Sequence, residues 1–221
     1  MTRWTARLLA AVGLGGRKSQ GDLSRDPGGH GSRRGGPHAE RRSTPRPPLP
    51  DDVIAVIASQ HELVKKLLEA VRQESGHSRA TAFHVLRLTL ALHETAEEQA
   101  IHPQALHQFG ANDRVVTNRI AEEQTAGQMI AVLELTDVDS DQFNYTFGHL
   151  AASVTDHAAA EEAEEWPALR AITDLALIKA MTEQMRAVTR LAENPSVPGI
   201  QATFGEMQDW AKASLPAPPP S

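Results

Sequence analysis

Two short segments of the chain carry the same pair of side chains that can bind a metal ion. Residues 93–97 read HETAE and residues 157–161 read HAAAE, so a histidine precedes a glutamate by four positions in each. Residues four apart in a helix lie about one turn apart on the same face, and both side chains can therefore reach one metal centre. The chain has no cysteine, so a metal held here is bound through nitrogen and oxygen.

Apolar residues recur at three- and four-residue spacing through most of the chain, which predicts amphipathic helices and not strands. Four helices are expected at residues 51–73, 80–100, 114–135 and 142–165, with further helical stretches at 168–193 and 200–213. Because the connections between the first four are short, the pattern predicts an all-α fold built on an up-down-up-down four-helix bundle.

Each of the four helices carries ionisable residues on the face that its apolar residues predict to be buried. From the first helix to the fourth these are His61, His93 and Glu97, Glu123, and His157 and Glu161. No Lys or Arg follows the same faces, and burying one unpaired carboxylate costs several kcal/mol. A folded domain is stable by only about 5–15 kcal/mol in total, so we expect a bound cation, and a metal ion fits best.

The two halves of this region align as a repeat of one helical hairpin. His61 aligns with Glu123, the two His-x-x-x-Glu pairs align with each other, and His102-Pro103 aligns with Trp166-Pro167. The repeat predicts one site between two hairpins related by a pseudo-twofold axis. His102 is then expected to pack at a helix end, and the remaining acidic and histidine side chains nearby are expected at the rim or the surface. These are Glu94, Glu98, Glu162 and His84.

The charge of the chain is divided unequally along its length. Residues 1–50, rich in Gly, Pro and Arg, hold ten basic against three acidic residues, which predicts a disordered basic arm. Residues 51–221 hold twelve basic against twenty-five acidic residues, which argues against nucleic-acid binding by the folded part. The apolar run near the N-terminus is too short for a membrane span, and we expect a cytoplasmic protein. Residues 194–221 are expected to form an amphipathic helix with a Pro-rich tail.

With these motifs in this order, residues 51–193 resemble the hemerythrin family, in particular the bacterial hemerythrin-like HHE cation-binding proteins. The resemblance rests on His61, HETAE at 93–97 and HAAAE at 157–161. It implies a four-helix bundle around a non-haem, usually oxo- or hydroxo-bridged, di-iron centre. Members of the family bind O2 reversibly, sense oxygen or iron, or decompose peroxide or nitric oxide.

The third helix departs from the family pattern. The family usually supplies histidine there, and the oxygen carriers supply two, one turn apart, whereas this chain has Glu123 and Gly127. Three His and three Glu then form the expected ligand set, which favours ferric iron because carboxylates are hard ligands. With bridging carboxylates and one bridging oxygen, this set leaves one coordination position for O2 or peroxide. If Glu123 does not bind, a mononuclear iron or zinc site is the alternative.

Three functions are compatible with the sequence. The first is an iron protein that binds or reacts with O2, peroxide or related small oxidants. The second is an iron- or oxygen-responsive module that acts through a protein partner, and the third is a metal-free helical interaction protein. The six ionisable residues expected in the interior weigh against the third.

Overall fold

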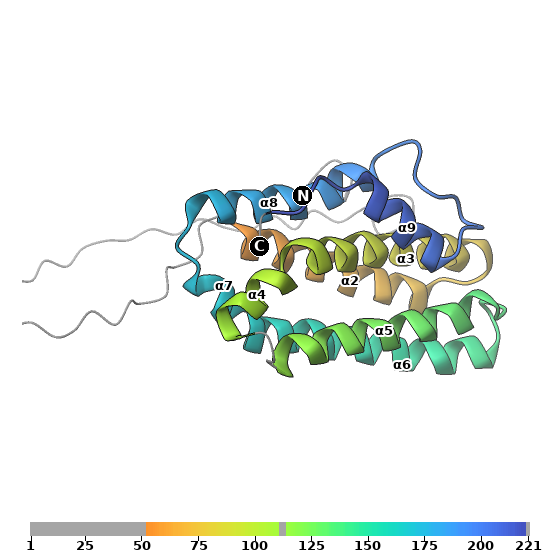
Figure 1. Ribbon diagram of the computed structural model, residues 1–221. Helices are drawn as coiled ribbons and strands as arrows, with labels where there is room; N and C mark the ends of the chain where they lie inside the picture. Colours follow the sequence, from red (N-terminus) through yellow and green to blue (C-terminus); the bar gives the residue numbers. More distant parts are fainter. Residues whose placement is uncertain (1–51, 111–113, 220–221) are drawn as a thin grey trace, which may run out of the picture.

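Four antiparallel helices form a bundle made of two helical hairpins (Figure 1). The computed structural model describes residues 52–110 and 114–219, and the arm predicted at residues 1–50 lies outside them. The bundle helices are α2 (Val53–Gln73), α3 (Gly76–Ala100), α5 (Arg114–Glu134) and α6 (Asp141–Ala160). Contacts of α2 with α6 and of α3 with α5 join the hairpins. The predicted all-α four-helix bundle is confirmed.

Polar capping residues begin the first helix of the first hairpin and the second helix of the second. The Asp52 carboxylate accepts a hydrogen bond from the Ala55 amide at 3.3 Å, and the Ser140 hydroxyl accepts one from the Phe143 amide at 3.1 Å. These bonds satisfy amide groups that have no partner within the helix. Helix α3 begins at Gly76, four residues before the predicted start, because Gly76 adopts a positive φ of 53° and turns the chain directly into the helix.

The two hairpin loops are tied to each other at one end of the bundle. The Gly76 amide donates to the Asp139 carboxylate at 2.9 Å, and nearby the rings of Phe83, Phe143 and Phe147 pack together in the interior. This end of the bundle has an apolar, aromatic core. The opposite end is where the polar residues of the repeat gather.

Short helices cap the polar end of the bundle, where α4 (His102–Phe109) and α7 (Trp166–Ala171) pack against each other (Figure 1). The sequence predicted a plain connection after residue 101, and this was wrong because the chain forms α4 there. The fourth predicted helix changes at its end into a π-helical turn, η1 (Glu161–Glu165). The stretch predicted as one helix at 168–193 is divided, because Asp174 caps a new helix, α8 (Leu175–Ala192).

Two further helices cover the first hairpin. Helix α8 packs against α2 and α3, and α9 (Phe204–Ser214) packs against α3 and, less extensively, α5. Helix α9 begins with a capping box between Thr203 and Glu206 and buries Phe204 and Met207. The buried Arg87 guanidinium on α3 pairs with Glu134 on α5 and donates to backbone carbonyls just before α9. In the described ranges, no helix combines the length and apolar character needed to cross a bilayer.

Candidate metal centre

The six residues predicted to bind metal lie together inside the bundle, towards the end capped by α4 and α7. They are His61 on α2, His93 and Glu97 on α3, Glu123 on α5, His157 on α6 and Glu161 at the start of η1. His157 is half-buried and the other five are buried. The structure therefore brings the whole predicted set to one place.

Their donor atoms form two overlapping clusters, and all atoms within a cluster lie within 4.8 Å of one another. One cluster contains His61 and His93, the other contains Glu123 and His157, and both contain Glu97 and Glu161. Two adjoining groups with two carboxylates in common can hold two metal ions side by side, as in the carboxylate centres of other four-helix bundles. A single metal ion would use only one of the groups.

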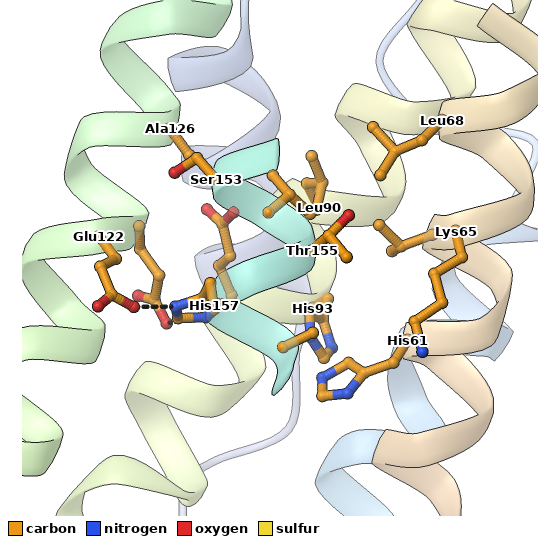
Figure 2. A pocket seen from close by; sticks show the side chains of 15 residues that line it. His61, Lys65, Leu68, Leu90, His93, Glu122, Ala126, Ser153, Thr155 and His157 are labelled. Atoms are coloured by element: carbon orange, nitrogen blue, oxygen red, sulfur yellow. Dashed lines mark hydrogen bonds and ion pairs between the residues drawn. The ribbon is translucent and has the colours of Figure 1, made fainter. Parts of the chain in front are cut away.

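Glu161 links the two hairpins. Its Oε2 atom lies 3.2 Å from His61 Nε2 on the first hairpin, and its Oε1 atom lies 3.4 Å from His157 Nε2 on the second. Figure 2 shows the His61 and His93 rings beside each other and His157 on the opposite side of the site. The ring centroids of His61 and His93 are 5.2 Å apart. One carboxylate thus faces imidazole nitrogens from both halves of the repeat.

Each of the three histidines is held through its outer nitrogen, Nδ1. His61 Nδ1 lies 3.0 Å from Glu162, His93 Nδ1 lies 2.9 Å from the Gln60 amide oxygen, and His157 Nδ1 lies 3.0 Å from Glu122. The last of these contacts is drawn in Figure 2. A hydrogen bond at Nδ1 orients the ring and leaves Nε2 free for a metal, as is usual for histidine ligands. Glu162, which was predicted at the rim, therefore holds the His61 ring through its Nδ1 atom.

The π-helical turn η1 places several acidic side chains around the site. Its amide hydrogen bond spans five residues, from the Trp166 N–H to the Glu161 carbonyl. A π turn inserts one extra residue and shifts the side chains after it, and such turns are frequent at functional sites. Here Glu161 faces the cluster, Glu162 contacts His61, and Glu165 is buried next to His102. The Trp166 ring then stacks on the His61 ring at a centroid distance of 6.0 Å.

The sequence reasoning misplaced two buried polar residues at the site, His102 and Glu94, and did not single out a third, Glu165. His102, expected only to pack at a helix end, lies 2.8 Å from Glu123 and 3.0 Å from Glu165. Glu94, expected at the surface, is 4 % exposed. The break between α3 and α4 turns His102 inward, and Glu94 lies in the wall of the cavity beside the clusters, together with His93 and Glu123. The expectation that Glu98 is exposed agrees with the structure, whereas His84 is half-buried and belongs to neither cluster.

The donor atoms of the clusters fit a metal ion because several are buried without a hydrogen bond. Within the described part of the chain these orphaned atoms include Nε2 of His61 and His157 and Oε2 of Glu97, Glu123 and Glu161. A buried polar atom without a partner costs about 1–3 kcal/mol, and more when it is charged. Within the described ranges, the three carboxylates form their ion pairs with histidine. A cation coordinated by these atoms satisfies them together.

Burial and the neighbouring charges shift the pKa values of the cluster residues. Burial and the nearby charge of Glu161 raise the pKa of Glu97 well above its ordinary value. Burial acts in the same direction on Glu161, but the imidazoles of His157 and His61 outweigh it and lower the pKa of that carboxyl. Burial lowers the pKa of His93 to about 3, whereas the Glu161 carboxylate, against the effect of burial, raises that of His157 to about 9.

A small cavity adjoins the donor atoms. The space open to the centre of a water-sized molecule measures about 20 Å³, enough for one small molecule. Apolar side chains form much of its wall, and His61, His93, Glu123 and His157 line it together with Glu94. Burial raises the pKa of Glu94 well above its ordinary value. The cavity therefore offers a largely apolar compartment in contact with both clusters.

Comparisons with known proteins agree with the geometry. The family model of the Hemerythrin HHE cation binding domain matches residues 52–169. A crystal structure of a hemerythrin HHE cation binding domain-containing protein from Mycobacterium kansasii superposes with a TM-score of 0.56 at 19% sequence identity. The superposition covers 64% of this chain and 86% of the other. A comparison with curated proteins finds no match.

Proposed function

Because this chain belongs to the hemerythrin HHE cation-binding family, we propose that its buried cluster holds a non-haem di-iron centre that binds or reacts with O2, peroxide or related small oxidants. The observation that carries the proposal is the pair of overlapping clusters with Glu97 and Glu161 in common. These two carboxylates are the residues we expect to bridge two metal ions. His61 and His93 complete one position, and Glu123 and His157 complete the other.

The donor set favours iron over the alternatives. Imidazole and carboxylate ligands suit iron, and a high share of carboxylate stabilises the ferric state. When bound, iron would supply electrons to a small oxidant such as O2 or peroxide. A mononuclear iron or a zinc ion remains the alternative if Glu123 pairs only with His102 and does not bind metal.

The cavity supports a small apolar or weakly polar ligand. Its volume of about 20 Å³ matches a molecule of the size of water, and O2 and peroxide are only slightly larger. The walls contributed by Val64, Leu68, Leu90 and Val154 limit the number of waters near the donor atoms. Such walls raise the strength of electrostatic interactions at the site. A cavity of this size and lining favours a small ligand over a larger substrate.

Metal analysis and optical spectra of the purified chain test the proposal. The protein is isolated from iron-supplemented cells, the iron per chain is measured, and near-ultraviolet and visible absorbance is recorded before and after peroxide. Two irons with oxo-to-iron absorption bands support the di-iron centre, and accelerated loss of peroxide identifies an enzyme. Spectral change on O2 addition without turnover favours binding or sensing. A chain that retains no iron after reconstitution refutes the proposal.

Histidine variants test the ligand assignment. His93→Ala and His157→Ala are each expected to abolish or halve metal binding, because each removes a nitrogen donor from one cluster. His84→Ala is the matched control on α3, since His84 lies outside both clusters, and it should bind iron like the wild-type chain. Equal losses in all three variants would contradict the assignment.

A further inference from the structure

His102 lies between two buried carboxylates at the start of α4. Its side chain is 2% exposed, with Nε2 2.8 Å from Glu123 Oε1 and Nδ1 3.0 Å from Glu165 Oε1. Glu123 is itself within 4.8 Å of the other members of the second cluster. A nitrogen of His102 forms a further group with Glu161 and Glu165, whose donor atoms also lie within 4.8 Å of one another. His102 is therefore in contact with the proposed centre and is not merely packed beside it.

The bonding of His102 follows the pattern of the three predicted histidines. In all four, Nδ1 faces an oxygen acceptor on the outer side, and Nε2 faces a cluster carboxylate. For His102 the outer acceptor is Glu165, whose second oxygen is buried without a partner. A carboxylate that holds Nδ1 fixes the tautomer and orientation that metal binding through Nε2 requires.

The backbone explains why a residue outside the repeat pattern reaches the site. On an uninterrupted helix, residue 102 lies about 140° round the axis from Glu97 and faces away. Helix α3 instead ends at Ala100, and Pro103 occupies the first turn of α4, a position that tolerates the missing amide hydrogen. The change of direction at Ile101 turns the His102 side chain into the bundle.

We propose that His102 is the fourth histidine ligand of the centre and binds the metal position formed by Glu123 and His157. The inference rests on the proposed metal centre and assigns it a residue that the repeat does not indicate. With His102 included, each position has two histidines: His61 and His93 at one, His102 and His157 at the other. The second position also has Glu123, so it carries one donor more than the first.

A purely electrostatic role is the competing explanation. In it, His102 is an imidazolium that pairs with Glu123 and Glu165 and never binds metal. The two explanations differ in what happens when the imidazole is replaced by a neutral side chain of similar polarity. Loss of a ligand removes a metal ion from the second position, whereas loss of a counter-ion leaves both metals bound or binds them more tightly.

Cobalt(II) binding to His102→Gln distinguishes them without any measurement of activity. Metal-free wild type, His102→Gln and the control His84→Gln are titrated with Co²⁺, and bound metal and visible absorbance are followed. We expect two cobalt ions per chain for wild type and control, and one tight cobalt ion for His102→Gln with about half of the visible absorbance. Two tight ions with an unchanged spectrum in His102→Gln overturn the proposal.

Glu165→Gln provides a second measurement that leaves the imidazole in place. It removes the charge that orients His102, so the affinity of one of the two cobalt ions is expected to fall about tenfold while the other is unchanged. Wild-type affinity for both ions counts against the proposal even if His102→Gln fails to fold. A wild-type chain that binds no cobalt or iron refutes the proposed centre itself, which is a different result from loss of one ion in the variant.

Discussion

The two hairpins occupy equivalent positions around the centre, yet they present different atoms to it. In the first hairpin, the neutral amide of Gln60 holds His93, and Gln60 in turn donates to a backbone carbonyl of α8. In the second, the carboxylate of Glu122 holds His157. Gln60 and Glu122 precede the aligned residues His61 and Glu123. The repeat has therefore kept the position of the supporting hydrogen bond while its charge has changed.

The segments that follow each hairpin cross over to the other one. His102, after the first hairpin, contacts Glu123 of the second, and Trp166, after the second, stacks on His61 of the first at an interplanar angle of 16°. These two residues are aligned in the repeat. A charged acceptor makes a histidine more basic than a neutral one does. With His102 as the proposed ligand, the second position has one donor more, and both of its histidines have a carboxylate acceptor, whereas at the first position only His61 does. The two hairpins place His93 and His157 in equivalent positions, but the acceptors that hold those histidines differ in charge.

The largest effect is expected where the hairpins share a residue. Glu161→Gln removes one of the two carboxylates that belong to both clusters, the one that faces histidines of both hairpins, and bound iron should fall from two per chain to nearly none. The neighbouring variant Glu162→Gln is the control, because Glu162 contacts the outer nitrogen of His61 and belongs to neither cluster, and it should retain two irons. Metal analysis after reconstitution decides, and a Glu161→Gln chain that still holds one iron would show that the positions are independent.

The pH dependence of stability should separate the hairpins in the metal-free protein. His157 has a pKa of about 9 against an ordinary value of 6.5, so its contribution to stability is complete below pH 6.5 and is lost as the pH rises through 9. His93 has a pKa of about 3, so the unfolded chain binds more protons between pH 3 and 6.5. Its contribution is therefore lost as the pH falls below 6.5.

Thermal unfolding of the metal-free chain from pH 4 to pH 10 measures both effects. His157→Gln should flatten the alkaline side of the stability curve, and His93→Gln should flatten the acid side. Iron should oppose the alkaline loss, because the metal must displace the proton from His157 and binds better as the pH rises. Identical curves for the two variants would contradict the difference between the hairpins.

The apolar periodicity was sufficient to predict the bundle and the six clustered residues. The periodicity is sufficient for His61, His93 and His157 because each of them continues a helical stripe of buried apolar residues. The direction of each side chain then follows from the helix itself. The repeat added the correct pairing between the hairpins. Helix ends were predicted less well. The start of α3 depends on the positive φ of Gly76 and that of α8 on the Asp174 cap, and periodicity detects neither.

His102, Glu94 and Glu165 could not be placed by the same reasoning. The direction of His102 depends on the break after Ala100, and that of Glu165 on the π turn, and both lie beyond the reach of a 3.6-residue period. Glu94 is buried beside the cavity at the clusters, one residue after His93 and off the apolar stripe that predicted burial. Pro103, next to His102, is a residue that favours the first turn of a helix, and it indicates a new helix start where the sequence analysis expected a connection.

Exchanging the acceptors behind the histidines should have a smaller effect than removing a ligand. Glu122→Gln gives the second hairpin the neutral acceptor of the first, and we expect two metals per chain with an affinity about tenfold lower at one position. Gln60→Glu makes the opposite change, but its amide also donates to Met185, so some stability should be lost. Cobalt titration compares the variants, and an unchanged affinity in Glu122→Gln would mean that its charge does not reach the metal.

The smallest effect is expected at Gly127, one turn after Glu123 on the same helix. The family's oxygen carriers have a second histidine at this point, but here the position faces the outer helix α9, and a Cβ atom would lie 3.5 Å from the Phe204 ring. That distance is an ordinary contact, so Gly127→Ala should leave metal content at two and raise the free energy of unfolding by up to about 1 kcal/mol through helix propensity. Gly127→His should gain no metal affinity, because α9 occupies the space beside it. Tighter metal binding by Gly127→His would show that the second hairpin still has room for the ligand that we assign to His102.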